Sequence, residues 1–182
     1  CQTLQTKSGL SWIEWRRKVV NEFLQQIRSE IKGELVLSLQ PDPASSLERY
    51  GVDFNDIAKF ADRFNVVIFS KNYATPWYCE MLARGFKKQL TKPFYINLYV
   101  YGPGDLAQDV PTPAEILTAT VRCARVGGVD GFVYFSDGEK EMQNFQKAAV
   151  ENIALRTKLS SFGGEPVQQF LGAVESWEKL FK

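Results

Sequence analysis

At 182 residues the chain is long enough for one domain with a hydrophobic core, and 45% of its residues are hydrophobic. Its net charge is +1, which excludes the strong positive field that gathers nucleic acid or an anionic membrane surface. It contains no histidine, which excludes Ser-His and Cys-His catalysis and imidazole metal ligands within the chain. No run of about eighteen apolar residues occurs, so no membrane-spanning helix is expected.

The chain begins with Cys1 instead of methionine, which indicates a processed or excised piece of a longer protein, with a lipoprotein as the alternative. We interpret residues 1–10 as a polar tether and residues 11–182 as a single βα-repeat domain. The cysteines lack the spacing of a zinc site. Cys79 and Cys123 fall in predicted helices and are expected to be small buried hydrophobic residues.

The first predicted element is an amphipathic helix over residues 11–32. Ser11 and Glu14 form a capping box at its start, and Gly33 is the residue type that ends a helix. Its apolar side chains recur at helical spacing on one stripe, made of Trp12, Trp15, Val19, Phe23, Ile27 and Ile31.

Four apolar segments are then predicted to be strands, each followed by a loop and a helix. The strands are 35–39, 66–70, 94–101 and 131–136. The main helices are predicted near 53–61, 75–90, 112–126 and 139–156, with a last amphipathic helix after Gly164. Strands that alternate with helices form parallel sheets with right-handed crossovers, so the predicted class is α/β with parallel βα units.

A flavodoxin-like open sheet is the alternative architecture for four such units. Sheets of that kind usually carry a glycine-rich phosphate loop after the first strand. Here the first strand ends in Pro41-Asp42-Pro43, and the chain contains no G-x-G-x-x-G motif. An open sheet with an unusual ligand stays as the alternative.

Three stretches resemble the glycoside-hydrolase-like (β/α)8 barrels. Residues 12–17, with the helix, strand and Pro-Asp-Pro end that follow, are similar to the fourth helix and fifth strand of those barrels. Residues 49–69 look like the approach to the sixth strand, and 128–136 resembles the eighth. The resemblance covers roughly residues 11–155 and implies a partial, half TIM barrel that lacks strands one to four.

The resemblance also limits which catalytic residues can be transferred. In the large retaining clan of these barrels, the general acid follows strand four and the nucleophile follows strand seven. The first position would lie upstream of Cys1, and the second, at 97–101, holds no carboxylate. A half barrel has exposed strand edges, which favour pairing with another chain. The expected partner is therefore a second copy in a homodimer or the missing N-terminal half.

Asp42 and Asp137 are the candidate catalytic residues, since each directly follows a predicted strand. Glycoside hydrolysis requires two carboxyl groups about 5 to 10 Å apart. The competing interpretations are a turn or cap aspartate for Asp42 and a helix N-cap for Asp137.

Candidate substrate-binding residues follow the second predicted strand. These are Lys71, Asn72 and Tyr73. Amide and phenol groups hydrogen-bond sugar hydroxyls, and a tyrosine ring can lie against a sugar face.

Two further tyrosines and a tryptophan could also contact a sugar. Tyr99 and Tyr101 share one face of the third strand by the two-residue period. Tyr101 is the candidate substrate contact, whereas Tyr99 is expected to pack in the core. Trp77, near the start of a helix, is expected to be a buried anchor.

The function expected from these patterns is a carbohydrate-active protein, the C-terminal part of a glycosidase, with no cofactor. A second hypothesis is a non-catalytic carbohydrate-binding or interaction domain, because a fold does not fix a function. A third is a barrel lyase or aldolase that uses Lys71 as a Schiff-base amine.

Overall fold

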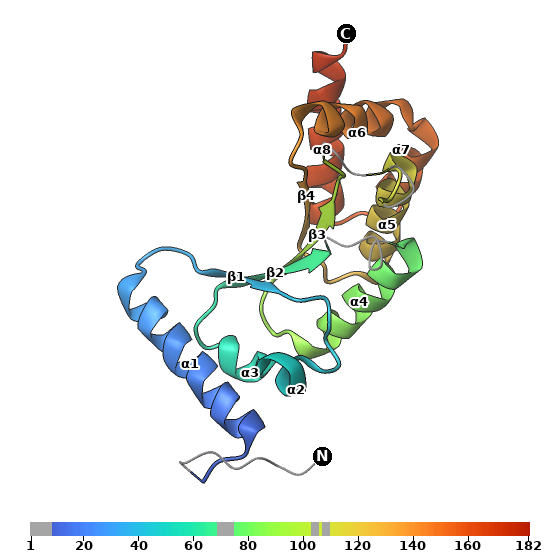
Figure 1. The fold of residues 1–182 in the computed structure, drawn as a ribbon. Coiled ribbons are helices and arrows are strands. Elements are labelled where there is room, and N and C mark those ends of the chain that lie inside the picture. Colours follow the sequence, from blue (N-terminus) through green and yellow to red (C-terminus); the bar gives the residue numbers. More distant parts are fainter. Residues whose placement is uncertain (1–8, 69–74, 103–105, 107–109) are drawn as a thin grey trace.

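The computed structural model describes residues 9–68, 75–102, 106 and 110–182. Strands alternate with helices around one four-stranded parallel sheet, which confirms the α/β class and the parallel βα units predicted from the sequence. Figure 1 shows helices below, to the right of and above the sheet, while the region at its upper left holds none.

The strands follow one another across the sheet in chain order. They are β1 (Val36–Leu39), β2 (Arg63–Ile68), β3 (Phe94–Tyr99) and β4 (Gly131–Phe135). Each neighbouring pair is parallel. Because right-handed crossovers between successive neighbours keep to one side of a sheet, this order places the connecting helices on a single face.

The helices are α1 (Trp12–Glu30), α2 (Ser46–Tyr50), α3 (Phe54–Ile57), α4 (Pro76–Gln89), α5 (Pro113–Val126), α6 (Glu139–Glu151), α7 (Ile153–Ser160) and α8 (Glu165–Leu180). Most helices lie close to their predicted positions, but α2 was not predicted and α3 is shorter than the predicted helix 53–61. The predicted capping box at Ser11 is present, and Thr112 and Glu115 form a second one at the start of α5. The predicted helix 139–156 is divided, because the side chain of Asn152 accepts a hydrogen bond from the Leu155 amide and starts α7 there.

One face of the sheet packs against the helices and forms the core. Its side chains include Phe64, Val66, Ile68, Ile96 and Leu98, all buried. The helices contribute Leu82 and Phe86 from α4 and Leu117 from α5, also fully buried. Burial of these side chains is the main source of folding free energy.

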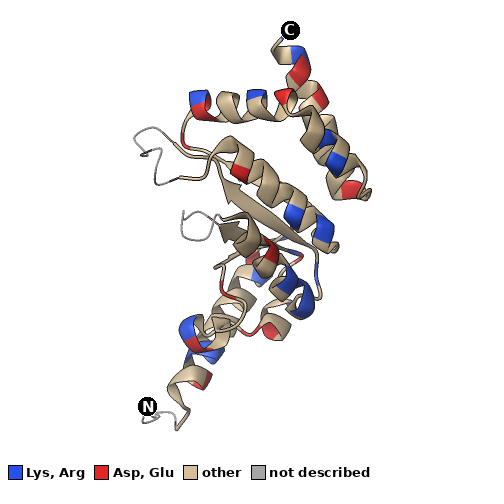
Figure 2. Cartoon of the chain, turned by 90° about the vertical axis from the view of Figure 1, so that its right-hand side faces the viewer, with Lys and Arg blue, Asp and Glu red and all other residues tan. Residues whose placement is uncertain are grey.

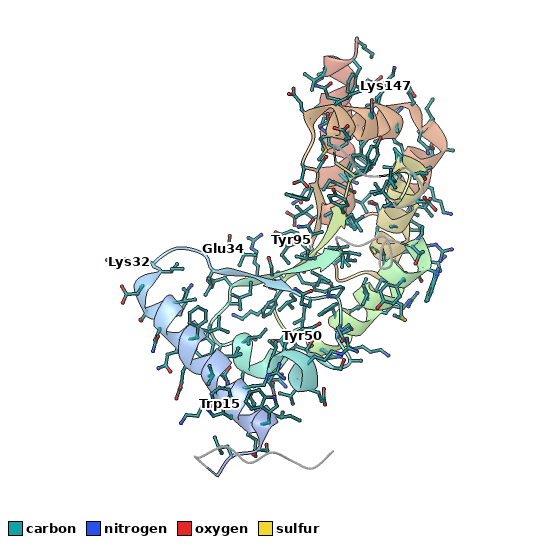
Figure 3. All side chains as sticks on the ribbon, in the orientation of Figure 1. Trp15, Lys32, Glu34, Tyr50, Tyr95 and Lys147 are labelled. Atoms are coloured by element: carbon teal, nitrogen blue, oxygen red, sulfur yellow. The ribbon has the colours of Figure 1, made fainter. Side chains whose placement is uncertain are left out.

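The other face, called the bare face below, is only partly shielded. It consists of the alternate strand positions Val36, Ser38, Arg63, Asn65, Val67, Tyr95, Asn97, Tyr99, Gly131, Val133 and Phe135. Three of its apolar side chains are 38–45% exposed, namely Val36, Val133 and Phe135. Figure 3 shows Tyr95 above the sheet and Tyr50 below it, beside α2. All-parallel sheets almost always have both faces covered, so this face is unusual for a parallel sheet.

Polar contacts attach α1 to the rest of the fold. Arg17 pairs with Asp56 at 2.6 Å and Asp53 at 3.2 Å. Hydrogen bonds from Arg17 and Lys59 lower the pKa of Asp56. Gly51 permits close approach, since a Cβ there would lie 2.8 Å from the Cβ of Arg16.

The predicted apolar stripe of α1 is largely exposed. Leu24 is the one residue of this helix that is fully buried, whereas Phe23 is 60% exposed and Trp12 is 47% exposed. The helical spacing of the stripe was read correctly from the sequence, but within this chain the stripe does not pack into the core.

Charges are spread over the helices and loops in both signs, as Figure 2 shows. The strands carry almost none, with Arg63 as the charged residue of β2. Among the described residues, the helices are too short or too polar to cross a bilayer.

Candidate functional site

The carboxyl ends of β3 and β4 bring a group of polar and aromatic residues together. Tyr99 and Phe135 are register partners, and their rings stack with centroids 6.1 Å apart and an interplanar angle of 30°. The Val100 amide donates to the Phe135 carbonyl at 2.6 Å, which keeps the two strand ends side by side. Ligands of parallel α/β folds bind at this end of the strands.

Gly102 lies between Tyr99 and Asp137. A Cβ at position 102 would lie 3.1 Å from the Tyr99 hydroxyl and 3.1 Å from the Cβ of Asp137. A larger residue at 102 would therefore push the phenol and the carboxylate-bearing chain apart. The structure thus places the Tyr99 hydroxyl and the Cβ of Asp137 next to Gly102.

Ser136 holds this arrangement together. Its Oγ lies 2.8 Å from the Tyr101 carbonyl, to which it donates, and it accepts a hydrogen bond from the Gly138 amide at 3.1 Å. We call these residues the mouth cluster: Tyr99, Tyr101, Gly102, Phe135, Ser136 and Asp137.

Asp137 is exposed and has no hydrogen-bond or ion-pair partner among the described residues. It does not cap the following helix, because the N-cap of α6 is Gly138 and no side chain makes the cap bond. The alternative interpretation of Asp137 as a helix cap is therefore wrong. Its carboxylate is available to a ligand.

Asp42, by contrast, is already engaged in a turn. Its carboxylate accepts from the Ser45 amide at 3.1 Å and from the Ser45 hydroxyl at 2.7 Å, and Arg49 lies 3.4 Å away. These contacts, the Ser45 hydroxyl first, lower the pKa of Asp42. Asp42 therefore has the role of a turn aspartate, the competing interpretation given above. The following Pro43 packs against Gly85 of α4.

Within one chain, the two candidate catalytic carboxylates are not brought together. Asp42 follows β1 and Asp137 follows β4, and these are the two outer strands of the sheet. Neighbouring strands lie about 4.8 Å apart, so three spacings separate the strands by about 14 Å along the sheet. That exceeds the separation of about 5 to 10 Å that glycoside hydrolysis uses. A catalytic role for the pair stays a prediction.

Of the predicted substrate contacts, Tyr101 belongs to the mouth cluster and is half-buried. Lys71, Asn72 and Tyr73 lie outside the described residues. Trp77 was expected to be a buried anchor, and this was wrong, because its side chain is 60% exposed. The buried stripe of α4 runs through Cys79, Leu82, Ala83 and Phe86.

Two amide oxygens on the bare face are buried without a hydrogen-bond partner in the described part of the chain. They are the Oδ1 atoms of Asn65 and Asn97. Asn97 is 6% exposed and precedes Tyr99 by two residues on the same face. An unsatisfied buried acceptor costs about 1 to 3 kcal/mol, so both oxygens are suited to accept a hydrogen bond from a group outside the chain.

Sequence reasoning missed Tyr99, which was assigned to the core, and the roles of Phe135, Gly102 and Asn97. The alternation of Tyr95, Asn97 and Tyr99 was the signal that these three side chains point to one face. The pattern alone did not show which face of the sheet the helices leave uncovered, because that depends on the side to which the βα crossovers pass.

The buried thiols do not offer a nucleophile. Cys79 and Cys123 are both fully buried, as predicted. Burial raises the pKa of Cys79 to about 12. A thiol in such surroundings stays protonated and inert at neutral pH. Among the described residues, no three acidic or cysteine side chains gather in a way that could hold a metal ion.

Comparison with known protein families, with curated protein sequences and with solved structures gave no match to this chain.

Proposed function

We propose that this chain binds carbohydrate at the mouth cluster, as part of a glycoside-hydrolase-like (β/α)8 barrel. The parallel strands in chain order and the helices on one face agree with a segment of such a barrel. The mouth cluster lies at the strand ends where barrels of this kind bind their ligands.

The observation that carries the proposal is the juxtaposition of the Tyr99 hydroxyl and Asp137 around Gly102, beside the half-exposed ring of Phe135. Sugar hydroxyls donate to a carboxylate and exchange hydrogen bonds with a phenol. The apolar face of a pyranose ring can lie against an aromatic ring. The cluster therefore offers the two kinds of contact that a sugar requires.

A second candidate function is binding without hydrolysis. It is favoured by one observation, namely that Asp42 and Asp137 follow opposite outer strands and cannot act on the same glycosidic bond within one chain. In this case the chain is a carbohydrate-binding module on a barrel scaffold.

The proposal is tested by binding of the purified chain to an array of glucose-, mannose-, xylose- and N-acetylglucosamine-based oligosaccharides. Asp137→Asn and Phe135→Ala should each weaken binding of any oligosaccharide that the wild-type chain retains by at least about tenfold, equivalent to about 1.4 kcal/mol. Glu139→Gln is the matched control, since this exposed carboxylate lies two residues further on, in the first turn of α6. It should leave binding unchanged.

Hydrolysis of the retained oligosaccharide, followed by chromatography, separates the two functions. Product formation that Asp137→Asn abolishes would support the glycosidase, and binding without product would support the module. No binding to any oligosaccharide, or binding that both mouth variants leave intact, would overturn the proposal.

A further inference from the structure

We propose that two copies of this chain join edge to edge, with β1 of each copy beside β4 of the other, into one closed eight-stranded barrel. Four parallel strands in chain order are half of an eight-stranded (β/α)8 barrel, and a two-fold axis supplies the other half. The partner is thus a second copy of this chain.

Both outer edges of the sheet are free to pair within the described part of the chain. β1 pairs on one side with β2, and β4 pairs on one side with β3. The outer backbone groups of such strands are ready to pair with another chain. Joining β1 to β4 of a second copy satisfies both edges at once, and no edge remains after closure.

The stagger of a closed barrel selects the residues that meet at this seam. In a barrel of this type, one full circuit of paired strands returns to the first strand shifted by eight residues, which is the shear. In a two-fold arrangement, each half therefore accounts for a shift of about four residues. The row Ser38–Asn65–Tyr95–Gly131 therefore continues to Glu34 of the second copy, four residues before Ser38. Two residues further along, Val133 of one copy faces Val36 of the other.

This pairing buries side chains that a single chain leaves exposed. Val36 and Val133 are among the exposed large hydrophobic residues, and both lie on the bare face of an outer strand. Closure turns the bare face into the barrel interior, where packed β-branched residues are the rule. It also surrounds the unpartnered amide oxygens of Asn65 and Asn97 with side chains from the second copy.

The exposed stripe of α1 has a place in the same assembly. In a βα repeat, a helix that precedes a strand also lies beside the strand before it, which for α1 is β4 of the second copy. Because α8 covers β4 within its own chain, the stripe of α1 would pack against α8 at this seam. A cavity of about 130 Å³ lies between β4 and α8. It is lined mostly by apolar side chains, namely Phe132, Tyr134, Pro166, Gln169, Phe170, Ala173 and Trp177.

The exposed aromatic side chains of α1 supply part of the area that a stable dimer needs. With roughly 200 Å² per aromatic side chain, the exposed parts of Trp12, Trp15 and Phe23 amount to about 300 Å². Each copy contributes the α1 stripe to one seam and the surface formed by β4 and α8 to the other. The bare face adds further buried area. A standard interface buries about 800 Å² per partner. One chain carries both complementary surfaces, which is why we assign the partner as a second copy.

Closure also changes the separation between the two candidate catalytic carboxylates. This consequence rests on the proposed carbohydrate site. The carboxyl end of β1 becomes the neighbour of the carboxyl end of β4 from the other copy. Asp42 and Asp137 then follow adjacent strands, about 4.8 Å apart, instead of the two outer strands of one sheet. Each dimer would hold two such pairs.

The dimer is tested first by the native mass of the purified chain from light scattering. We expect twice the chain mass of 20.7 kDa. Phe23→Lys should weaken the dimer by at least tenfold, whereas Gln25→Lys, an exposed position on another side of α1, should leave its mass unchanged. A chain that stays monomeric at its highest soluble concentration would overturn the proposal.

Disulfide trapping tests the seam itself. In a Cys1→Ser background, the double variant Val36→Cys/Val133→Cys should form covalent dimers on mild oxidation, because position 36 meets position 133 of the other copy. Neither single variant should do so, and the native Cys79 and Cys123 are fully buried. Single variants that trap as efficiently as the double variant would indicate a face-to-face dimer and contradict the seam.

The outcomes also separate this inference from the proposed function. Asp137→Asn should remain dimeric, because its side chain lies at the mouth and not in the seam. A dimer that binds no oligosaccharide would contradict the carbohydrate proposal alone, and a monomer that binds oligosaccharide would contradict the barrel closure alone.

Discussion

The two faces of the sheet are built from the same strands but have different surroundings. In β2, Phe64, Val66 and Ile68 point to the helices and are completely buried, whereas Asn65 and Val67 point to the bare face and remain partly exposed. In β4, Val133 and Phe135 are exposed and the intervening Tyr134 packs against Phe145 and Phe170. The alternation of side chains thus produces one face that stabilises the chain and one that is available for contacts.

The bare face differs from the core in composition as well as in exposure. It contains amide, phenol and guanidinium groups as well as valines, and it ends in the mouth cluster. The helix-packed face has almost no polar groups, apart from the Tyr134 hydroxyl, which hydrogen-bonds Thr120 at 2.8 Å. The apolar packing that stabilises the chain and the exposed polar groups are therefore separated onto opposite sides of one sheet.

The largest expected difference between the faces is in stability. Phe64→Ala should lower the free energy of unfolding by about 3 to 5 kcal/mol, because the side chain is fully buried among helices and strands. Val133→Ala should change it by about 0.5 kcal/mol or less in dilute solution, as for exposed sites. Urea unfolding followed by far-UV circular dichroism measures both.

A matched comparison uses Val66→Ala, which removes the same atoms as Val133→Ala but from the helix-packed face. If the two valine variants lost equal stability in dilute solution, the bare face would be covered in the single chain. The distinction between the two faces would then be wrong.

One position on the bare face is expected to behave like the core. A Cβ at Gly131 would lie 2.3 Å from two ring atoms of Tyr95, its register partner. Gly131→Ala should therefore cost about 1 to 3 kcal/mol through overpacking. Gly33→Ala is the control, since a Cβ there meets no atom within 4 Å and the change should stay within about 0.5 kcal/mol.

The steric cause is tested by a double-mutant cycle in urea. Tyr95→Ala removes the ring, so Gly131→Ala should cost much less in that background, with a coupling energy of about 1 to 2 kcal/mol. Additive effects of the two substitutions would show that the ring does not lie over Gly131 in solution.

The elements were predictable from the sequence where local signals determine them. The capping boxes at Ser11 and Thr112 and the apolar runs of the strands depend on neighbours within a few residues. The parallel order followed from the alternation of strands and helices. By contrast, β2 begins at Arg63, three residues before its predicted start, because pairing with β1 extends the strand through polar positions.

Most of the site was not predictable, because it depends on contacts between distant segments. Gly102 matters through its closeness to Tyr99 and Asp137, and no local pattern reveals that contact. Asp137 was singled out from its place after a strand, yet whether it caps α6 or faces solvent depended on the loop geometry. Likewise, the spacing of the α1 stripe indicated an amphipathic helix but not what covers its apolar side.

The smallest expected effect comes from a substitution that stabilises the chain instead of destabilising it. Because the buried Asn97 oxygen lacks a partner among the described residues, Asn97→Leu should raise the free energy of unfolding by about 1 kcal/mol in dilute solution. Asn65→Leu, at a more exposed position of the same face, should have a smaller effect. Urea unfolding at several protein concentrations measures both. In a closed dimer the Asn97 amide gains polar neighbours, so the gain should shrink or reverse as concentration rises. A loss of stability already in dilute solution would mean that the amide is hydrogen-bonded in the single chain.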